Sequence, residues 1–413
     1  MNIWLVNPFD PLPLKDPLRY SYLLRVLAEA GHSVTWWTSR FAHWGKCYIS
    51  KCQLEVENSR LRPHGRIVAT WTTPYWKHVG VARVINHLAW ARTFYRTARR
   101  SSDRPDVIFV SSTPLYAAHL ALRLAKEYGA LAVLDVVDLW PEAFENVVPS
   151  PLRPYAKWCF RPLLALENRN FRKVNAITAV SETYRLTALS RSGSDKPSMT
   201  VPYGIDFSEC ASYKPACVSP PDSRIRVCYA GTLGPGHDVS TVLNAARLLS
   251  FDRRLEFIIA GDGPMRAELE SKANAMGLLN VKFTGWLDLG ALRKLLTTCL
   301  IGVIAVKKES VISVPLKAYE YWAAGMALVH SLSGDFEKLV KDGKLGVPYD
   351  AEDPISLANA ISGLLKNTEL VLTMGKSGRQ LVEEKFDRQV IHRRLMSFLC
   401  SLSEKRRLEM LRD

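Results

Sequence analysis

The chain has 413 residues, which is long enough for two domains of ordinary size. Its composition, 47% hydrophobic and 23% charged, is that of a globular protein. No apolar run approaches the roughly 18 residues of a membrane span. Residues 1–8 lack a basic stretch before the apolar ones, so we expect a first strand there and not a signal peptide.

The formal net charge of +15 is concentrated in the first half of the chain. Residues 1–200 carry 27 Lys and Arg against 15 Asp and Glu, whereas the remaining 213 residues carry 28 against 25. A basic surface attracts nucleic acid, anionic lipid or phosphorylated substrates. Nucleic acid is disfavoured here, because the basic residues mix with bulky apolar ones and no nucleic-acid-binding motif is present.

Eight cysteines are scattered along the chain, with no Cys-x-x-Cys pair and no zinc-type spacing of Cys and His. We therefore expect reduced thiols in a cytoplasmic protein. We also expect no metal site, because carboxylates and histidines do not cluster with ligand spacing.

Short apolar runs alternate with longer helical patterns along the whole chain. In the first half the expected strands are 3–6, 33–38, 107–110, 131–135, 176–180 and 199–201. In the second half they are 225–229, 256–260, 281–284, 301–305 and 327–330. Strands that alternate with helices form parallel βαβ units. The sequence therefore predicts an α/β protein with two doubly wound sheets, joined by a Pro- and Ser-rich connector within 207–223.

Two segments of the first half, 76–104 and 153–173, interleave basic with aromatic residues. The basic residues Arg92, Arg96, Arg99 and Arg100 recur at helical spacing, so one face of a helix is cationic. Trp158 belongs to the second segment. We expect this surface to rest on an anionic membrane. The alternative is a solvated basic face with the aromatic residues in the core.

Two glycine-containing turns follow expected strands of the second half. The first contains Gly231, Gly234, Gly236 and His237, and the second contains Gly261 and Gly263. Glycines at such a turn let backbone amides approach an anion at a helix N-terminus; alternatively, these are ordinary turns. Trp286 ends another strand and could cover a base by stacking or simply pack.

The segment 315–325 predicts a short helix with a defined start and stop. Pro315 suits the first helical position, and Gly325 suits the left-handed position that ends a helix. Between them Glu320 is a carboxylate in an apolar and aromatic setting, where it needs a partner such as a ligand hydroxyl or a cation. The alternative is a solvent-facing helical glutamate.

This helix has the form Lys-x-x-Glu-Tyr-x-Ala-x-Gly from Lys317 to Gly325, and it resembles the donor-site helix of the GT-B glycosyltransferases, specifically retaining family four. The resemblance covers nearly the whole chain. It implies two Rossmann-like domains facing a central cleft. These are an acceptor domain at 1–207, a nucleotide-sugar donor domain at 208–385, and a C-terminal helix at 386–413 that returns to the first domain.

In the donor domain, the resemblance implies that Glu320 binds the ribose hydroxyls of a nucleotide-sugar, with Pro315 and Leu316 beside it. The glycine turns, His237 and Trp286 would complete this site. The family's first glutamate falls at Ile312, and its Arg or Lys diphosphate clamp is missing, which leaves His237 as the one cation in the first turn. We expect Lys317 to compensate as a catalytic cation at the phosphates, unless it is a surface lysine.

In the acceptor domain, the segment from Asp138 to Glu142 resembles the Asp-Leu-Trp-Pro stretch of a bacterial subgroup that builds surface polysaccharides on lipid carriers. It implies that Asp138, with Glu142 as a weaker candidate, orients the acceptor hydroxyl; alternatively, Asp138 caps a helix. The family's glycine-rich first loop contacts phosphate. Here it lacks glycine, and we expect Lys15 and Arg19 to supply charge instead.

The resemblance implies a retaining, metal-independent transferase without a cofactor, at the inner face of the cytoplasmic membrane. The acceptor hydroxyl would attack from the face that the diphosphate leaves, so that the protein works by positioning and charge stabilisation. Two alternatives remain open at this stage. One is a nucleotide-sugar epimerase or hydrolase on the same fold, and the other is a catalytically inactive GT-B subunit.

Overall fold

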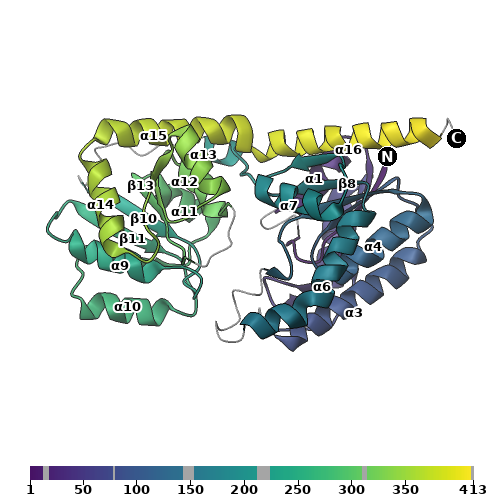
Figure 1. Ribbon diagram of the computed structural model, residues 1–413, viewed down its shortest axis with the longest axis horizontal. Helices are drawn as coiled ribbons and strands as arrows, with labels where there is room; N and C mark the ends of the chain where they lie inside the picture. Colours follow the sequence, from purple (N-terminus) through teal and green to yellow (C-terminus); the bar gives the residue numbers. More distant parts are fainter. Residues whose placement is uncertain (13–17, 78–79, 143–152, 212–223, 309–313, 411–413) are drawn as a thin grey trace. The chain divides into compact units, whose positions relative to one another are not determined.

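The computed structural model describes residues 1–12, 18–77, 80–142, 153–211, 224–308 and 314–410 (Figure 1). The chain divides into two compact units. Unit 1 consists of Met1–Tyr203 and Ile391–Asp413, and unit 2 consists of Gly204–Val390. These divisions lie within a few residues of those expected at 207 and 385, and most of the expected connector, 212–223, is outside the described residues.

Unit 1 is built on a seven-stranded parallel sheet of order β5-β2-β1-β6-β7-β8-β9. Its strands are β1 (Asn2–Val6), β2 (Ser33–Ser39), β5 (Gly65–Thr70), β6 (Val107–Ser111), β7 (Leu131–Val136), β8 (Ala176–Ala179) and β9 (Ser198–Thr200). A small antiparallel pair, β3 (Phe41–Ala42) and β4 (Cys47–Tyr48), follows β2.

Helices cover both faces of this sheet. They are α1 (Arg19–Glu29), α2 (Lys51–Leu61), α3 (Val81–Arg99), α4 (Leu115–Tyr128), α6 (Arg153–Lys173), α7 (Glu182–Ser192) and the last helix, α16 (Arg388–Met410). One face packs against α1 and α16, where Ile391, Leu395 and Leu399 join the core. The other face packs against α3, α4 and α6, which lie side by side in Figure 1.

Unit 2 repeats this plan with a six-stranded parallel sheet of order β12-β11-β10-β13-β14-β15. Its strands are β10 (Ile225–Ala230), β11 (Leu255–Ala260), β12 (Val281–Gly285), β13 (Ile301–Ile304), β14 (Ala327–His330) and β15 (Gly346–Pro348). Its helical segments are α8 (Ser208–Ala211), α9 (Val239–Leu248), α10 (Arg266–Ala275), α11 (Leu289–Leu296), α12 (Leu316–Ala323), α13 (Asp335–Gly343), α14 (Pro354–Leu365), α15 (Thr368–Leu381) and the π-helical turn η2 (Val382–Phe386).

The predicted fold class, two doubly wound parallel sheets, is confirmed. The sequence prediction missed the edge strands β5 and β15, which are short or start with glycine and therefore give a weak strand pattern. One local prediction is shifted: Pro315 is the N-cap, with extended backbone at φ −74° and ψ 135°, and the helix begins at Leu316. Gly325 has φ +76° and ends the helix as predicted.

Candidate functional site

Helix α12 is anchored so that two of its polar residues lie at the carboxyl edge of the unit 2 sheet. Tyr321 is fully buried, and its hydroxyl accepts a hydrogen bond from the Ala230 N–H at the end of β10, at 2.6 Å. Gly302 makes room for that ring, because a Cβ there would lie 2.5 Å from it. Lys317 and Glu320 are three residues apart, so they lie on the same side of this anchored helix.

Glu320 is held by an arginine that the sequence did not single out. Arg293 of α11 donates from Nε to Oε2 of Glu320 at 3.0 Å and from Nη2 to Oε1 at 3.2 Å. Its Nη1 also donates to Glu209 at 2.5 Å. A guanidinium and a carboxylate paired in this way are fixed in one plane. The expected cation beside Glu320 is therefore a side chain of the protein itself.

Lys317 has a half-buried side chain whose Nζ is shielded from solvent and, within the described residues, has no hydrogen-bond partner. The Nζ lies 4.1 Å from the ring centre of Tyr229 and 2.8 Å from the position that a Cβ on Gly231 would take. Burial lowers its pKa to about 7. Gly231 thus leaves space for the ammonium group. An anion bound beside Lys317 would favour the charged form of the lysine and raise its pKa.

His237 does not supply the cation that the sequence suggested for this turn. Burial, followed by the positive charge of Lys317, lowers the pKa of His237 to about 4, so the ring is neutral at pH 7. The next residue, Asp238, caps α9 by accepting from the Thr241 N–H at 3.3 Å. Of the two cations that the sequence suggested for the diphosphate, His237 and Lys317, Lys317 is the one that stays in question here.

The two glycine turns are joined to each other through their backbones. The N–H of Gly231 donates to the Ala260 carbonyl at 2.8 Å, and the N–H of Leu233 donates to the Asp262 carbonyl at 2.9 Å. A Cβ on Gly261 would lie 1.9 Å from the carbonyl oxygen of Gly231, and one on Gly263 would lie 2.4 Å from that of Leu233. Gly261 and Gly263 are therefore required for the close approach of the two loops.

The remaining donor-side candidates lie around the same edge. Gly234 and Gly236 are in the first turn, and a Cβ on Gly236 would meet nothing within 4 Å. Trp286 follows β12 and is 74% exposed, so it is a surface ring and not a core residue. Leu316 is exposed at the start of α12. The position of the family's first glutamate, Ile312, is outside the described residues.

In unit 1, Asp138 lies just beyond β7 at the carboxyl edge of the sheet. Part of the residue is exposed to solvent, but the protein around its carboxyl group excludes water and raises the pKa to about 6. The positive charge of Arg83 lowers this pKa, but by less than burial raises it. Asp138 is thus largely ionised at pH 7 and close to half protonated at pH 6. A carboxylate of this kind can accept a hydrogen bond from an acceptor hydroxyl.

Aromatic and basic side chains lie near Asp138, and of these the sequence connected only Trp140, of the Asp-Leu-Trp-Pro segment, with it. The Arg83 guanidinium, in the first turn of α3, lies 5.8 Å from the ring centre of Phe9 and 5.6 Å from that of Trp140. His87 packs on the same two rings. Burial, with nearby positive charge, lowers its pKa to about 3, so His87 is neutral. Phe9 and Trp140 each follow an expected strand end, a signal that could have revealed the cluster.

Arg19 does not offer its charge to a ligand. Its Nε and Nη2 bind the Asp135 carboxylate at 2.7 and 2.6 Å, and its Nη1 donates to the Val201 carbonyl at 2.6 Å. Both side chains of the ion pair are buried. Asp135 also accepts from the hydroxyls of Tyr20 and Thr178. The prediction that Arg19 supplies charge to a phosphate is therefore wrong. Arg19 instead forms a buried ion pair that links α1 to β7.

The start of α1 is also occupied by a protein group. Asp10 accepts from the backbone N–H groups of Tyr20 at 2.5 Å and Ser21 at 3.3 Å. A carboxylate in this place satisfies the helix N-terminus, where relatives of the resembled family contact phosphate. Lys15, the other candidate in this loop, lies outside the described residues.

Glu142 pairs with Arg191, which binds Glu167 as well, at 2.7 Å. Burial and the neighbouring charge of Glu142 raise the pKa of Glu167 to about 8. Glu142 is therefore part of a three-residue charge cluster between α6 and α7. This arrangement favours a structural role and leaves Asp138 as the acceptor-side carboxylate.

The residues predicted to face a membrane lie on the surface of unit 1. Arg92, Arg96, Arg99 and Arg100 are exposed along α3, and Trp158 in α6 is 71% exposed. The alternative that places the aromatic residues in the core thus holds for Trp90 and Phe94 but not for Trp158.

Across the helices described, none is both long and apolar enough to cross a membrane. Nor do three His, Cys, Asp or Glu side chains of the described residues gather as a metal site.

The two units match two glycosyltransferase sequence families. Residues 19–204 match the family described as "Glycosyl transferase 4-like domain", and residues 224–367 match "Glycosyl transferases group 1". The chain belongs to the GT-B glycosyltransferases. The two matches fall on the predicted acceptor and donor domains.

Two curated relatives align with part of the chain. The α-D-kanosaminyltransferase of Streptomyces kanamyceticus is 28% identical over 167 residues, which are 40% of this chain and 42% of that protein. The lipopolysaccharide core biosynthesis glycosyltransferase LpsE of Rhizobium meliloti is 27% identical over 144 residues, or 35% of this chain and 41% of LpsE. The alignments thus span less than half of either relative.

Solved structures share the fold over almost the whole chain. Sucrose-phosphate synthase of Thermosynechococcus elongatus has a TM-score of 0.73 at 17% identity, and the alignment covers 97% of this chain and 98% of the synthase chain. HepE of Anabaena, solved in complex with UDP, has a TM-score of 0.69 at 16% identity and covers 97% and 99%. These neighbours are GT-B enzymes, which confirms the fold that the sequence resemblance implied.

Proposed function

We propose that this protein moves a sugar from a nucleotide-diphosphate-sugar to a saccharide acceptor, with retention of configuration and without a metal or other cofactor. The observation that carries the proposal is the pair Lys317 and Glu320 on α12. The Nζ of Lys317 is shielded from solvent beside the first glycine turn. Glu320 is fixed by Arg293 and keeps lone pairs for hydroxyl donors. A diphosphate joined to a ribose offers an anion to the lysine and hydroxyls to the glutamate.

The chemistry that follows needs few protein groups. The bond between the anomeric carbon and the diphosphate oxygen breaks, and a bond from that carbon to the acceptor oxygen forms on the same face. The acceptor proton passes to an oxygen of the leaving diphosphate. Lys317 would stabilise the charge that develops on the diphosphate, and Asp138 would orient the acceptor hydroxyl.

We further propose that the acceptor saccharide is carried on a lipid, in the biosynthesis of a surface polysaccharide or lipopolysaccharide. Two observations support this. The segment from Asp138 to Glu142 resembles that of the polysaccharide-building subgroup, and the relative LpsE is named for lipopolysaccharide core biosynthesis. The protein would then act in the cytoplasm at the inner face of the membrane, where such an acceptor is met.

A thermal-shift screen with a panel of nucleotide-diphosphate-sugars tests the donor assignment, because a ligand that binds the folded state raises its melting temperature. We expect at least one member to raise the melting temperature in EDTA as much as in Mg²⁺. Lys317→Met should abolish that shift. If no member stabilises the protein, the donor assignment is wrong. Product analysis with and without an acceptor then separates transfer from hydrolysis or epimerisation.

A further inference from the structure

The solvent-facing side of helix α3 is apolar in the first half of the helix and cationic in the second half. Its inner side, with Trp90, Phe94 and Ala98, is buried against the sheet. The outer side of its first half carries four aliphatic residues that are between 47% and 76% exposed, namely Val81, Val84, Ile85 and Leu88. Their spacing puts them on successive turns of one face. Contiguous exposed apolar residues of this kind mark an interaction surface.

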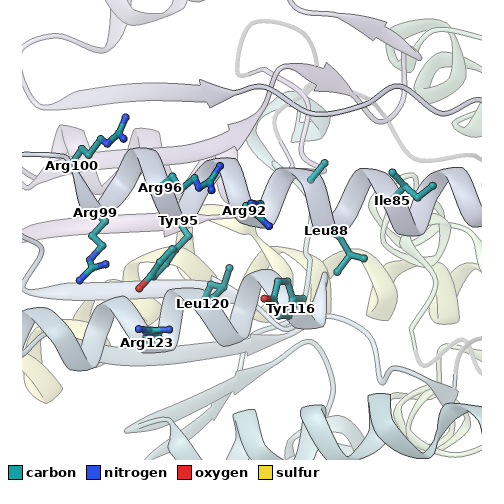
Figure 2. Close-up of a pocket in the computed structure, with 11 residues that line it drawn as sticks. Ile85, Leu88, Arg92, Tyr95, Arg96, Arg99, Arg100, Tyr116, Leu120 and Arg123 are labelled. Carbon is teal, nitrogen blue, oxygen red and sulfur yellow. The ribbon is translucent and has the colours of Figure 1, made fainter.

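The same side becomes cationic in the second half of the helix, and it borders a groove. The groove between α3 and α4 has a volume of about 820 Å³. Figure 2 shows Leu88 close to Tyr116 and Ile85 farther along α3 towards one end of the groove, and Arg99, Arg100 and Arg123 towards the other. The groove is therefore apolar at the N-terminal ends of the two helices and basic at their C-terminal ends.

The basic end has an excess of positive charge. Its five arginines are Arg92, Arg96, Arg99, Arg100 and Arg123. Glu127 binds Arg99 at 3.3 Å and Arg123 at 3.0 Å. Arg92, Arg96 and Arg100 form no ion pair with any part of the chain that the structure describes. Guanidinium groups bind phosphate in a bidentate manner, so an anionic phosphate complements this end.

The apolar end faces the same edge of the sheet as the acceptor cluster. Because α3, α4 and α6 connect parallel strands, their N-termini all lie at its carboxyl edge. Asp138 follows β7 at that edge, and the exposed Tyr155 and Trp158 are in the first turns of α6. Exposed Trp and Tyr side chains on the same edge of a domain as exposed aliphatic ones are typical of proteins that sit in a lipid–water interface.

We propose that the groove between α3 and α4 docks an anionic phospholipid of the membrane, with the phosphate at the arginines and an acyl chain along the aliphatic half of α3. The negative phosphate complements the positive charge of the arginines. The aliphatic side chains are covered as well only if the partner also has an apolar part, as a phospholipid does. A free phosphate or a nucleic-acid backbone would leave them exposed. The inference extends the proposed membrane location to a defined site, and it requires no transfer reaction.

Co-sedimentation of the full chain with vesicles of phosphatidylcholine, with and without phosphatidylglycerol, tests the basic end. We expect binding to the anionic vesicles only. The triple variant Arg92→Glu, Arg96→Glu, Arg100→Glu should bind them roughly a hundredfold or more weakly, at about 1 kcal/mol for each arginine near anionic lipid. The matched control replaces the exposed Lys338, Lys366 and Lys376 of unit 2 with Glu. An equal loss in this control would overturn the groove assignment in favour of overall charge.

A second variant tests the apolar end. Val84→Ser, Ile85→Ser, Leu88→Ser leaves every arginine in place and should still weaken binding to the anionic vesicles severalfold at the same salt concentration. The control replaces three exposed apolar residues of unit 2, Phe251, Leu279 and Ile355, with Ser. If the α3 variant binds like the wild type, the lipid assignment is wrong. Nucleotide-sugar thermal shifts on the same variants show that they fold and test the donor site separately.

Discussion

Arg293 and Glu320 face each other from α11 and α12, with both carboxylate oxygens of the glutamate within 3.2 Å of a guanidinium nitrogen. Burial disfavours the charge on Arg293, but its hydrogen bonds to Glu320 and Glu209 outweigh burial and hold its pKa above the ordinary value. The arginine is thus permanently charged, and it fixes the carboxylate before a ligand arrives. Such preorganisation lowers the entropy cost of binding.

The first prediction concerns this carboxylate. Glu320→Gln should weaken binding of the nucleotide-sugar by about 1.5–3 kcal/mol, the scale of a hydrogen bond to a charged group. Isothermal calorimetry measures the change. Glu209→Gln is the matched control, because it removes the other partner of Arg293 and leaves Glu320 in place. If Glu320→Gln retains full affinity, or if Glu209→Gln loses as much, the ribose assignment is wrong.

The second prediction is a pH dependence that comes from Lys317. Its pKa in the unliganded protein is lowered to about 7 by burial. A bound diphosphate would favour the ammonium form and raise that pKa, so donor binding takes up a proton above pH 7. We therefore expect the dissociation constant of the nucleotide-sugar to be flat below pH 7 and to increase up to tenfold per pH unit above it.

Calorimetry in buffers of different ionisation enthalpy at pH 8 detects the proton uptake directly. Lys317→Arg supplies the control, because a guanidinium stays charged over this range. This variant should show a flat pH profile and no proton uptake. A wild-type profile that is equally flat between pH 7 and 9 would contradict the role of Lys317 at the phosphates.

The parts of this site that local sequence signals specify were predictable. Pro315 and Gly325 bracket α12, and their backbone preferences act within a turn of the residue that carries them. The partner of Glu320 was not predictable in this way, because Arg293 is 27 residues away on another helix. Its position depends on how α11 and α12 pack, and hydrophobic periodicity does not specify which polar side chains meet.

The same limit explains the correction at Arg19. In the sequence it is a basic residue at the end of a loop, with the appearance of a surface charge. Its partner Asp135 lies 116 residues away in β7, a strand that the sequence predicted correctly as a buried apolar run. A charge inside such a strand needs a counter-charge. The signal was therefore present in Asp135, although it did not identify Arg19 as the partner.

The third prediction compares two glycines of the donor edge. Gly261→Ala would place a Cβ 1.9 Å from the carbonyl oxygen of Gly231, at a backbone φ of +147°. We expect it to destabilise the protein by at least about 2 kcal/mol, through a backbone clash together with unfavourable backbone geometry. Gly236→Ala meets nothing within 4 Å and should change stability by less than about 1 kcal/mol. Urea denaturation distinguishes them, and similar stabilities would contradict the close approach of the two loops.

The last prediction concerns Asp138. Its pKa is raised to about 6 by loss of solvent around the carboxyl group, so the charged form that accepts a hydrogen bond is lost as the pH falls through 6. At saturating donor, where the titration of Lys317 does not limit binding, the turnover rate should therefore fall about tenfold per pH unit below pH 6.

Asp138→Asn should lower the turnover rate at pH 7.5 by 10²-fold or more, the scale of a lost group that acts on the reacting hydroxyl, and should remove the acidic limb of the profile. Glu142→Gln is the control, since Glu142 already pairs with Arg191 and is not expected to touch the acceptor. A variant Asp138→Asn that keeps both its rate and the acidic limb would show that another group titrates. Asp138 would then not be the residue that orients the acceptor hydroxyl.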